Sequence, residues 1–206
     1  MASPDPTVQY GTPAFYAALG RAFVAMCGVF AGLMLIEFID QRLHNSLDQR
    51  FGIEPHEVSG LDGVIFAPFL HSGWDHLLRN SSAIIILGTF ALAAGTRRFL
   101  QATVIIALAS GLGVWCLTPR GYLVLGASGI AFGWLGLLFV RGLVDRSRWH
   151  FAVGGIAALL YGWQLNLLLP KDQSISWQGH LCGFIGGAIA AVLTRRRLPK
   201  PTDVPA

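Results

Sequence analysis

Apolar residues fall into six long runs along the chain, and short polar or charged segments separate them. The runs cover about residues 21–39, 76–94, 99–117, 123–140, 151–169 and 178–194. Each is close to the ~20 residues that a helix needs to cross the hydrocarbon core of a bilayer. The pattern predicts an all-α, polytopic membrane protein, with six transmembrane helices in one compact bundle.

The composition agrees with this prediction. Of the 206 residues, 53% are hydrophobic and 13% are charged, whereas a soluble domain is typically about 25% charged. The net charge of +4 does not indicate nucleic-acid binding, because no basic stretch is interleaved with aromatic residues. The three cysteines all lie in apolar runs and are expected to behave as small buried hydrophobes: Cys27, Cys116 and Cys182.

The basic residues between the runs predict the orientation. With the N-terminus in the cytoplasm, ten Lys and Arg residues lie inside and four outside, so the positive-inside rule favours cytoplasmic N- and C-termini. We expect residues 1–17 to form a short cytoplasmic tail, residues 18–194 the membrane domain and residues 195–206 a short basic cytoplasmic tail. The first helix is expected to be retained rather than removed as a signal peptide.

The longest loop, about residues 40–75, then lies outside. Its apolar stretch at residues 64–70 is expected to pack on the bundle or lie in the membrane interface. Glu37, at the outer end of the first run, is expected either to extend its carboxylate to the membrane interface or to bond to this loop, rather than to form a lone ion site.

Two polar residues stand at the outer ends of apolar runs. Ser128 lies in Gly126-Ala127-Ser128-Gly129, and His180 lies in Gly179-His180-Leu181-Cys182-Gly183. A hydroxyl and an imidazole are costly in such segments unless they line a wet cavity or meet each other. If they meet, they form a nucleophile and its general base. No carboxylate is well placed to complete a triad, so the sequence predicts a dyad.

Small residues predict how the two helices meet. Glycines at four-residue or similar spacing let transmembrane backbones approach closely, and two such sets adjoin the proposed dyad: Gly129, Gly133 and Gly136, and Gly179, Gly183 and Gly187. Phe132 follows Ser128 by one turn and is expected to stack on His180. Without the dyad, Phe132 would be interpreted as core filling.

Acyl transfer also needs hydrogen-bond donors for the developing oxyanion. His76 and Asn80 are four residues apart and share one helix face, at the same expected depth as Ser128 and His180. With the backbone N–H of Ser128 they provide three candidate donors. His71 and His76 do not predict a metal site, because no further ligands complete a set. We expect no metal and no cofactor.

Three separated motifs resemble those of the rhomboid family of intramembrane serine proteases: His71-x4-His76-x3-Asn80, Gly126-x-Ser128-Gly129 and Gly179-His180-x2-Gly183-x3-Gly187. The resemblance implies that Ser128 is the nucleophile and His180 the general base. It places Gly126, His76 and Asn80 in the oxyanion region, makes His71 a structural histidine, and puts Phe132 against the imidazole.

The same resemblance implies that single-pass membrane proteins are the substrates, cut in or near their transmembrane segments. The chain departs from many members by having Gly60-Leu61-Asp62-Gly63 where they carry a Trp-Arg pair. The short amino tail suggests a core-only member, and a bacterial plasma membrane is the expected location. The oligomeric state is not predicted.

Two alternatives remain at this stage. One is a catalytically inactive rhomboid-like protein that binds membrane clients, although such relatives lack the serine or the histidine. The other is a small six-helix transporter, but the polar residues of this chain cluster near one face instead of following a path through the bilayer.

Overall fold

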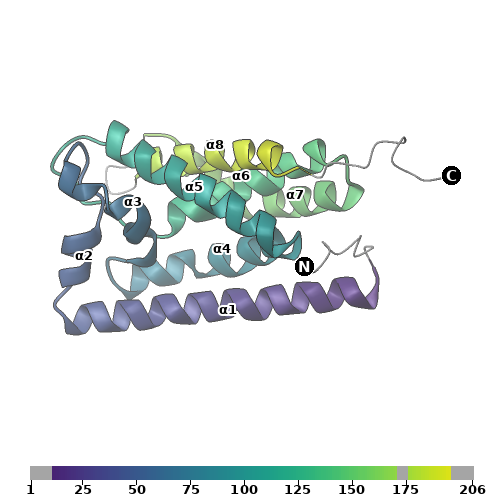
Figure 1. Ribbon diagram of the computed structural model, residues 1–206, viewed down its shortest axis with the longest axis horizontal. Coiled ribbons are helices and arrows are strands. Elements are labelled where there is room, and N and C mark those ends of the chain that lie inside the picture. Colours follow the sequence, from purple (N-terminus) through teal and green to yellow (C-terminus); the bar gives the residue numbers. More distant parts are fainter. Residues whose placement is uncertain (1–10, 171–175, 196–206) are drawn as a thin grey trace.

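The computed structural model describes residues 11–170 and 176–195, so residues 1–10, 171–175 and 196–206 lie outside the described part. Six longer helices form the bundle (Figure 1): α1 (Pro13–Arg42), α4 (Trp74–Ala93), α5 (Thr96–Leu117), α6 (Ser128–Val144), α7 (Arg148–Tyr161) and α8 (Trp177–Leu193). Four helical segments are long and apolar enough to cross a membrane, namely α1, α4, α5 and α7 with its continuation, while α6 and α8 are shorter apolar helices. The predicted all-α membrane bundle is confirmed.

Short helices occupy the connection between α1 and α4. They are α2 (Ser46–Phe51), η1 (Val58–Gly60), α3 (Gly63–Phe66) and η2 (Ala67–Phe69). Figure 1 shows α2 and α3 at one end of the bundle, here called the loop end, whereas α1 begins and α8 ends at the opposite, terminal end. Val64, Ala67 and Leu70 are buried, and α3 packs on α5. The apolar stretch of the outer loop therefore packs on the bundle, as predicted.

The fourth apolar run begins at about residue 123, whereas helix α6 begins at Ser128, the residue expected at the outer end of this run. Residues 123–126 lie outside any helix, and Val124 pairs with Ile53 of the outer loop through two backbone hydrogen bonds of 2.8 and 3.0 Å. The Gly126 N–H donates to the carbonyl of Ala67 at 2.9 Å, and its φ of +119° is incompatible with a helix. These long-range bonds and the glycine outweigh the local apolar pattern, so α6 begins at Ser128.

Two other boundaries also differ from expectation. The fifth apolar run is an α-helix only as far as Tyr161, and the chain then continues as the 3-10 helix η3 (Gly162–Leu168). At the start of the chain α1 begins at Pro13, inside the stretch expected to be a tail. The Thr12 hydroxyl caps this helix by accepting from the Phe15 N–H at 3.3 Å, and proline suits the first turn because its missing N–H would be unpaired there.

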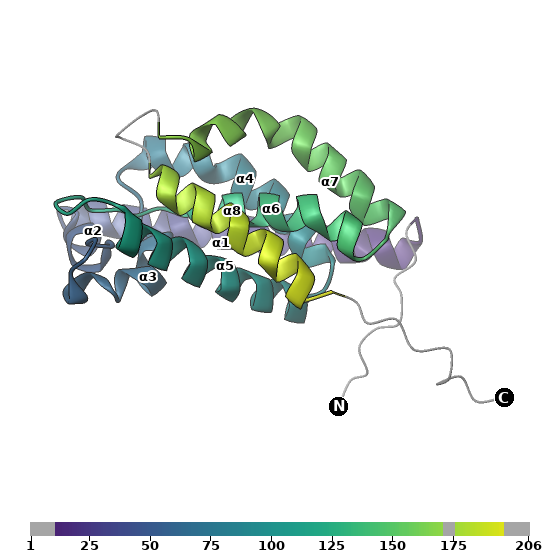
Figure 2. The same cartoon turned by 90° about the horizontal axis from the view of Figure 1, so that it is seen from above.

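Helix α6 lies at the centre of the bundle (Figure 2), with most of its residues buried. It packs most extensively on α8. A side chain added at Gly183 would collide with the carbonyl of Gly129, and one at Gly187 with the carbonyl of Gly133. The predicted close approach of the two glycine sets is therefore present. The remaining core is mostly aliphatic, with Leu77, Ile84, Leu87, Ile106 and Leu135 among its residues.

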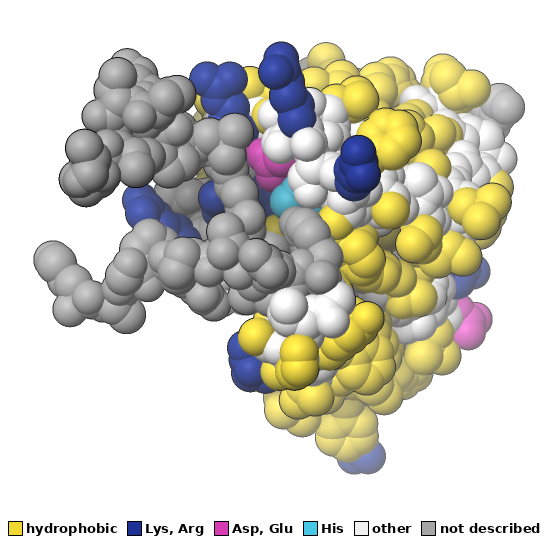
Figure 3. Space-filling view, turned by 90° about the vertical axis from the view of Figure 1, so that its right-hand side faces the viewer, with side chains coloured by type: hydrophobic (Ala, Val, Ile, Leu, Met, Phe, Trp, Pro, Cys, Tyr) yellow, Lys and Arg dark blue, Asp and Glu magenta, His cyan; other side chains and the backbone are white. Residues whose placement is uncertain are grey.

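The outer surface of the bundle is apolar. Large hydrophobic side chains are exposed on several helices, and Figure 3, which looks onto the terminal end, shows them around the flanks. Examples are Val24 on α1, Val104 on α5 and Leu159 on α7. Such extended exposure suits helices that face lipid instead of water.

Acidic side chains at the end of α1 hold the outer loop in place. The Asp40 carboxylate accepts from the backbone N–H of Leu47 at 2.7 Å and of Asp48 at 3.3 Å. Glu37 is buried and accepts from the Gln41 side chain at 2.8 Å. The Gln41 oxygen in turn accepts from the Trp74 indole at 2.9 Å, so the network joins α1 to α2 and to the start of α4.

Candidate active site

Ser128 and His180 meet at the loop end of the bundle. Ser128 is the first residue of α6, and His180 lies in the first turn of α8. The Nε2 atom of His180 lies 2.9 Å from the Ser128 hydroxyl. The Nδ1 atom lies 3.2 Å from the carbonyl oxygen of Leu167 in η3. Because a carbonyl only accepts, Nδ1 carries the ring hydrogen and the Nε2 lone pair faces the serine. This is the arrangement of a nucleophile with its base.

The local structure of both helices fixes this distance. Ser176 caps α8, since its hydroxyl accepts from the Gly179 N–H at 3.4 Å. The Ser110 hydroxyl of α5 donates to the Gly179 carbonyl at 2.9 Å and also lies where a side chain on Gly129 would stand. Glycine at 129 therefore lets α5, α6 and α8 converge one residue after Ser128.

The Phe132 ring packs on the imidazole. The two ring centroids are 4.3 Å apart and the planes differ by 24°. Both side chains are buried, with 5% of each exposed. The stacking expected from the sequence is therefore present, and it limits rotation of the His180 ring about its side-chain bonds.

His76 of α4 lies beside Gly126, two positions before Ser128. Its Nδ1 accepts from the Ser72 N–H at 3.4 Å and lies 3.1 Å from the Ser72 hydroxyl, so Nε2 carries the hydrogen. A side chain built on Gly126 would lie 2.8 Å from the His76 Cε1 atom and 2.9 Å from Nε2. Glycine at 126 thus leaves room for the His76 ring edge and also permits the positive φ described above.

His71 supports the peptide that leads into α6. It is buried, and its Nε2 accepts from the Ala127 N–H at 3.3 Å. Its ring packs edge-on against His76, with centroids 5.2 Å apart. Burial, with a smaller contribution from nearby His76, lowers the pKa of His71 to about 3. The ring is therefore neutral at physiological pH and keeps an acceptor lone pair for Ala127.

Asn80 lies one turn further along α4. Its side-chain amide donates to the His76 carbonyl at 3.0 Å, within its own helix. A primary amide has two N–H donors, so the second is left for another acceptor. From the sequence, both amide hydrogens of Asn80 were expected to be available to the oxyanion. In the structure one of them is used in the hydrogen bond to the His76 carbonyl within α4.

Sequence reasoning missed several groups of this site. The Leu167 carbonyl has no side-chain signature, because any residue supplies the same backbone oxygen. Ser72 occupies an unspecified position of the first motif, and Ser110 lies outside all three motifs, where a polar residue in the middle of an apolar run was the only available signal. Among the described residues, no group of three or more His, Cys, Asp or Glu side chains is arranged to hold a metal ion.

Comparisons with known proteins point to one family. The family model of the Rhomboid domain matches residues 59–197, a range that contains every site residue described above. An uncharacterized protein of Mycobacterium tuberculosis is 41% identical over 169 residues, which cover 78% of this chain and 70% of the relative. A second uncharacterized protein, from Mycobacterium leprae, is 36% identical over 178 residues, which cover 82% and 70%.

A relative with a named activity is more distant. The rhomboid-type serine protease 2 of Yarrowia lipolytica is 28% identical over 142 residues, which cover 64% of this chain and 46% of the relative.

Proposed function

Because the chain belongs to the rhomboid family, we propose that it is an intramembrane serine endopeptidase in which Ser128 and His180 form the catalytic dyad. It is a multi-pass integral membrane protein. The observation that carries the proposal is the 2.9 Å contact between the His180 Nε2 atom and the Ser128 hydroxyl. A serine in hydrogen-bond contact with a correctly oriented imidazole is the minimal unit for acyl transfer.

The reaction follows from the hydrogen positions. The His180 Nε2 atom takes the Ser128 hydroxyl proton as the oxygen attacks the substrate carbonyl carbon. The tetrahedral intermediate collapses when the imidazolium gives that proton to the leaving amine, which breaks the C–N bond and leaves an acyl-serine. Water then attacks the ester with His180 again as base, and the acid product and free serine are released. The Leu167 carbonyl and the Phe132 ring face stabilise the transient imidazolium.

We propose three hydrogen-bond donors for the developing oxyanion. They are the Ser128 backbone N–H at the start of α6, the second amide hydrogen of Asn80 and the Nε2 hydrogen of His76. The first N–H groups of a helix have no partner within the helix, so the Ser128 N–H is free of the intrahelical ladder. The absence of a side chain at Gly126 lets the His76 ring edge approach the peptide that leads to Ser128.

Family membership implies substrates that lie in the bilayer, and we propose single-pass membrane proteins cut near the loop end of this bundle. Among the described residues, basic side chains concentrate at the terminal end, at the start of α5, between α6 and α7, and after α8. By the positive-inside rule this end faces the cytoplasm, with both chain termini, and the dyad faces the outer side of a bacterial plasma membrane.

The test is cleavage of a model single-pass substrate by the full chain in liposomes. We expect Ser128→Ala and His180→Ala to lose cleavage while retaining the helical content and thermal midpoint of the parent. The matched control is Ser81→Ala, which removes an exposed α4 hydroxyl that donates only to the Leu78 carbonyl and should cleave normally. Undiminished cleavage by Ser128→Ala would overturn the proposal. Binding of the substrate without cleavage by the folded parent would instead favour an inactive, client-binding member of the family.

A further inference from the structure

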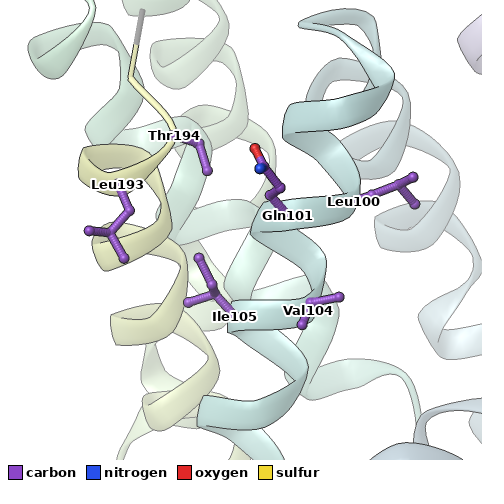
Figure 4. Close-up of a pocket in the computed structure, with 6 residues that line it drawn as sticks. All are labelled: Leu100, Gln101, Val104, Ile105, Leu193 and Thr194. Carbon is purple, nitrogen blue, oxygen red and sulfur yellow. The ribbon is translucent and has the colours of Figure 1, made fainter.

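A hollow lies between α5 and α8 at the terminal end, far from the dyad along both helices. Its volume is about 490 Å³, and six residues line it (Figure 4): Leu100, Gln101, Val104, Ile105, Leu193 and Thr194. Nothing in the proposed proteolytic mechanism uses these residues, because Ser128 and His180 stand at the opposite ends of α6 and α8.

The lining is polar at one end and apolar at the other. Gln101 and Thr194 lie across from each other near the terminal end, while Val104 and Ile105 follow one turn deeper (Figure 4). Leu100, Val104 and Leu193 are more than half exposed, at 57%, 58% and 68%. The hollow therefore opens sideways toward lipid, and its polar mouth lies nearest the bilayer surface.

Positive charge borders the polar mouth. Arg97 precedes Gln101 by four residues and so shares its helix face. Arg195 follows Thr194 directly, and both arginines are exposed. Neither α5 nor α8 contains an aspartate or glutamate. The acidic side chain between α6 and α7, Asp145, is buried and paired with His150 at 3.2 Å.

We propose that this hollow binds an anionic phospholipid of the leaflet at the terminal end. One acyl chain lies along Val104, Ile105 and Leu193, and the phosphate interacts with Arg97 and Arg195, with Gln101 beneath it. The Thr194 hydroxyl is already bonded to the Ala190 carbonyl and to the Arg141 side chain, so it lines the hollow without binding the phosphate. An ion pair between arginine and phosphate is strong because both partners are charged and the guanidinium forms two parallel hydrogen bonds. A zwitterionic lipid brings its own cation to the same place, so the site selects lipids with net negative charge.

The experiment measures retained lipid by native mass spectrometry. The full chain is released from vesicles of equal phosphatidylglycerol and phosphatidylcholine content, and the two adducts are counted. We expect preferential retention of phosphatidylglycerol. Each of Arg97→Gln and Arg195→Gln should lower that retention by about fivefold, since one cation near a membrane surface contributes on the order of 1 kcal/mol. Val104→Trp should fill the hollow and displace the lipid without changing the charge.

Two matched controls separate a site from general attraction to basic surface. Arg21→Gln removes an exposed cation from α1, and Val24→Trp adds a ring to an exposed α1 position. Both should retain phosphatidylglycerol as the parent does. Equal retention of the two lipids, or equal losses in Arg97→Gln and Arg21→Gln, would overturn the proposal. Since the charge variants alter only exposed side chains, they test it even if Val104→Trp fails to fold. Cleavage is not measured, so failure here leaves the proposed protease function untouched.

Discussion

At the scale of single residues, one backbone oxygen orients the proposed base. The Leu167 carbonyl lies 3.2 Å from the Nδ1 atom of His180, where a serine protease triad has a carboxylate. A neutral carbonyl selects the same imidazole tautomer but stabilises the imidazolium less than a carboxylate does. Phe132 supplies the second restraint on the ring. Orientation of His180 thus depends on packing to a larger degree than in a triad.

This dependence gives a prediction for Phe132. We expect Phe132→Tyr to keep most of the cleavage rate, because a second aromatic ring preserves the stack. Phe132→Ala should lower kcat by about 10-fold or more, since a misplaced base loses part of the 100- to 10,000-fold that general-base catalysis contributes. The measurement is single-turnover cleavage in liposomes. If Phe132→Ala cleaved at the rate of the parent, the Phe132 ring would only fill the core and would not position His180.

The sequence predicted which side chains meet at the site better than it predicted their hydrogen-bond partners. Ser128, His180 and Phe132 were expected together because an imidazole, a hydroxyl and a ring one turn away form a recognisable set. The Leu167 carbonyl was not expected, because its position depends on how η3 folds back toward α8. One N–H of the Asn80 side chain donates to a carbonyl within α4. The spacing of residues along the sequence does not reveal such a bond within a helix.

At the scale of elements, close helix contact holds the dyad together. The glycines of α6 and α8 place one backbone against the other, and an added methyl group at Gly187 would meet the Gly133 carbonyl. Because this carbonyl belongs to the backbone, it cannot move aside by rotation as a flexible side chain could. The helices must separate to accept a side chain, and Ser128 and His180 belong to these same two helices.

Gly187→Ala should therefore lower the free energy of unfolding by about 1–3 kcal/mol, the usual cost of overpacking. The control is Gly155→Ala on α7, where an added side chain meets nothing within 4 Å. This control should be neutral or stabilising, by up to about 1 kcal/mol, because alanine restricts the unfolded chain more than glycine does. Thermal denaturation in detergent measures both. Equal midpoints for the two variants would contradict the close-contact account.

The outer loop gives a prediction on pH. Burial, followed by the charge and hydrogen bonding of Asp40 and the charge of Glu37, raises the pKa of Asp48 from 3.8 to about 7. The folded state therefore binds the Asp48 proton more tightly than the unfolded state does. This contribution to stability is fully present below about pH 4 and is lost as the pH rises through 7.

We expect the thermal midpoint of the parent to fall between pH 6 and pH 8.5 and Asp48→Asn to flatten that fall. The control Asp75→Asn changes an exposed carboxyl on α4 and should keep the slope of the parent. A parent midpoint that is constant over this range would show that Asp48 does not titrate there.

At the scale of the whole molecule, the two ends of the bundle have different chemistry. The loop end holds His71, His76, His180, Ser128 and the first-loop helices, whereas the terminal end carries a concentration of arginines and the proposed lipid site. The six apolar runs predicted this layout because membrane spans are set by length and hydrophobicity alone. The non-helical path of residues 123–126 was not predicted, since the pairing of Val124 with Ile53 and the positive φ of Gly126 depend on tertiary contacts.

The most direct test of the central claim is covalent labelling of Ser128 by a fluorophosphonate, with the modified peptide identified by mass spectrometry. It needs no knowledge of the natural substrate, because the probe reports an activated serine. We predict an adduct on Ser128 in the parent and in Ser81→Ala, none at this site in Ser128→Ala, and labelling at least ~100-fold slower in His180→Ala. Equal labelling rates in the parent and His180→Ala, or no adduct on the folded parent, would contradict the assignment of Ser128 and His180 as a catalytic dyad.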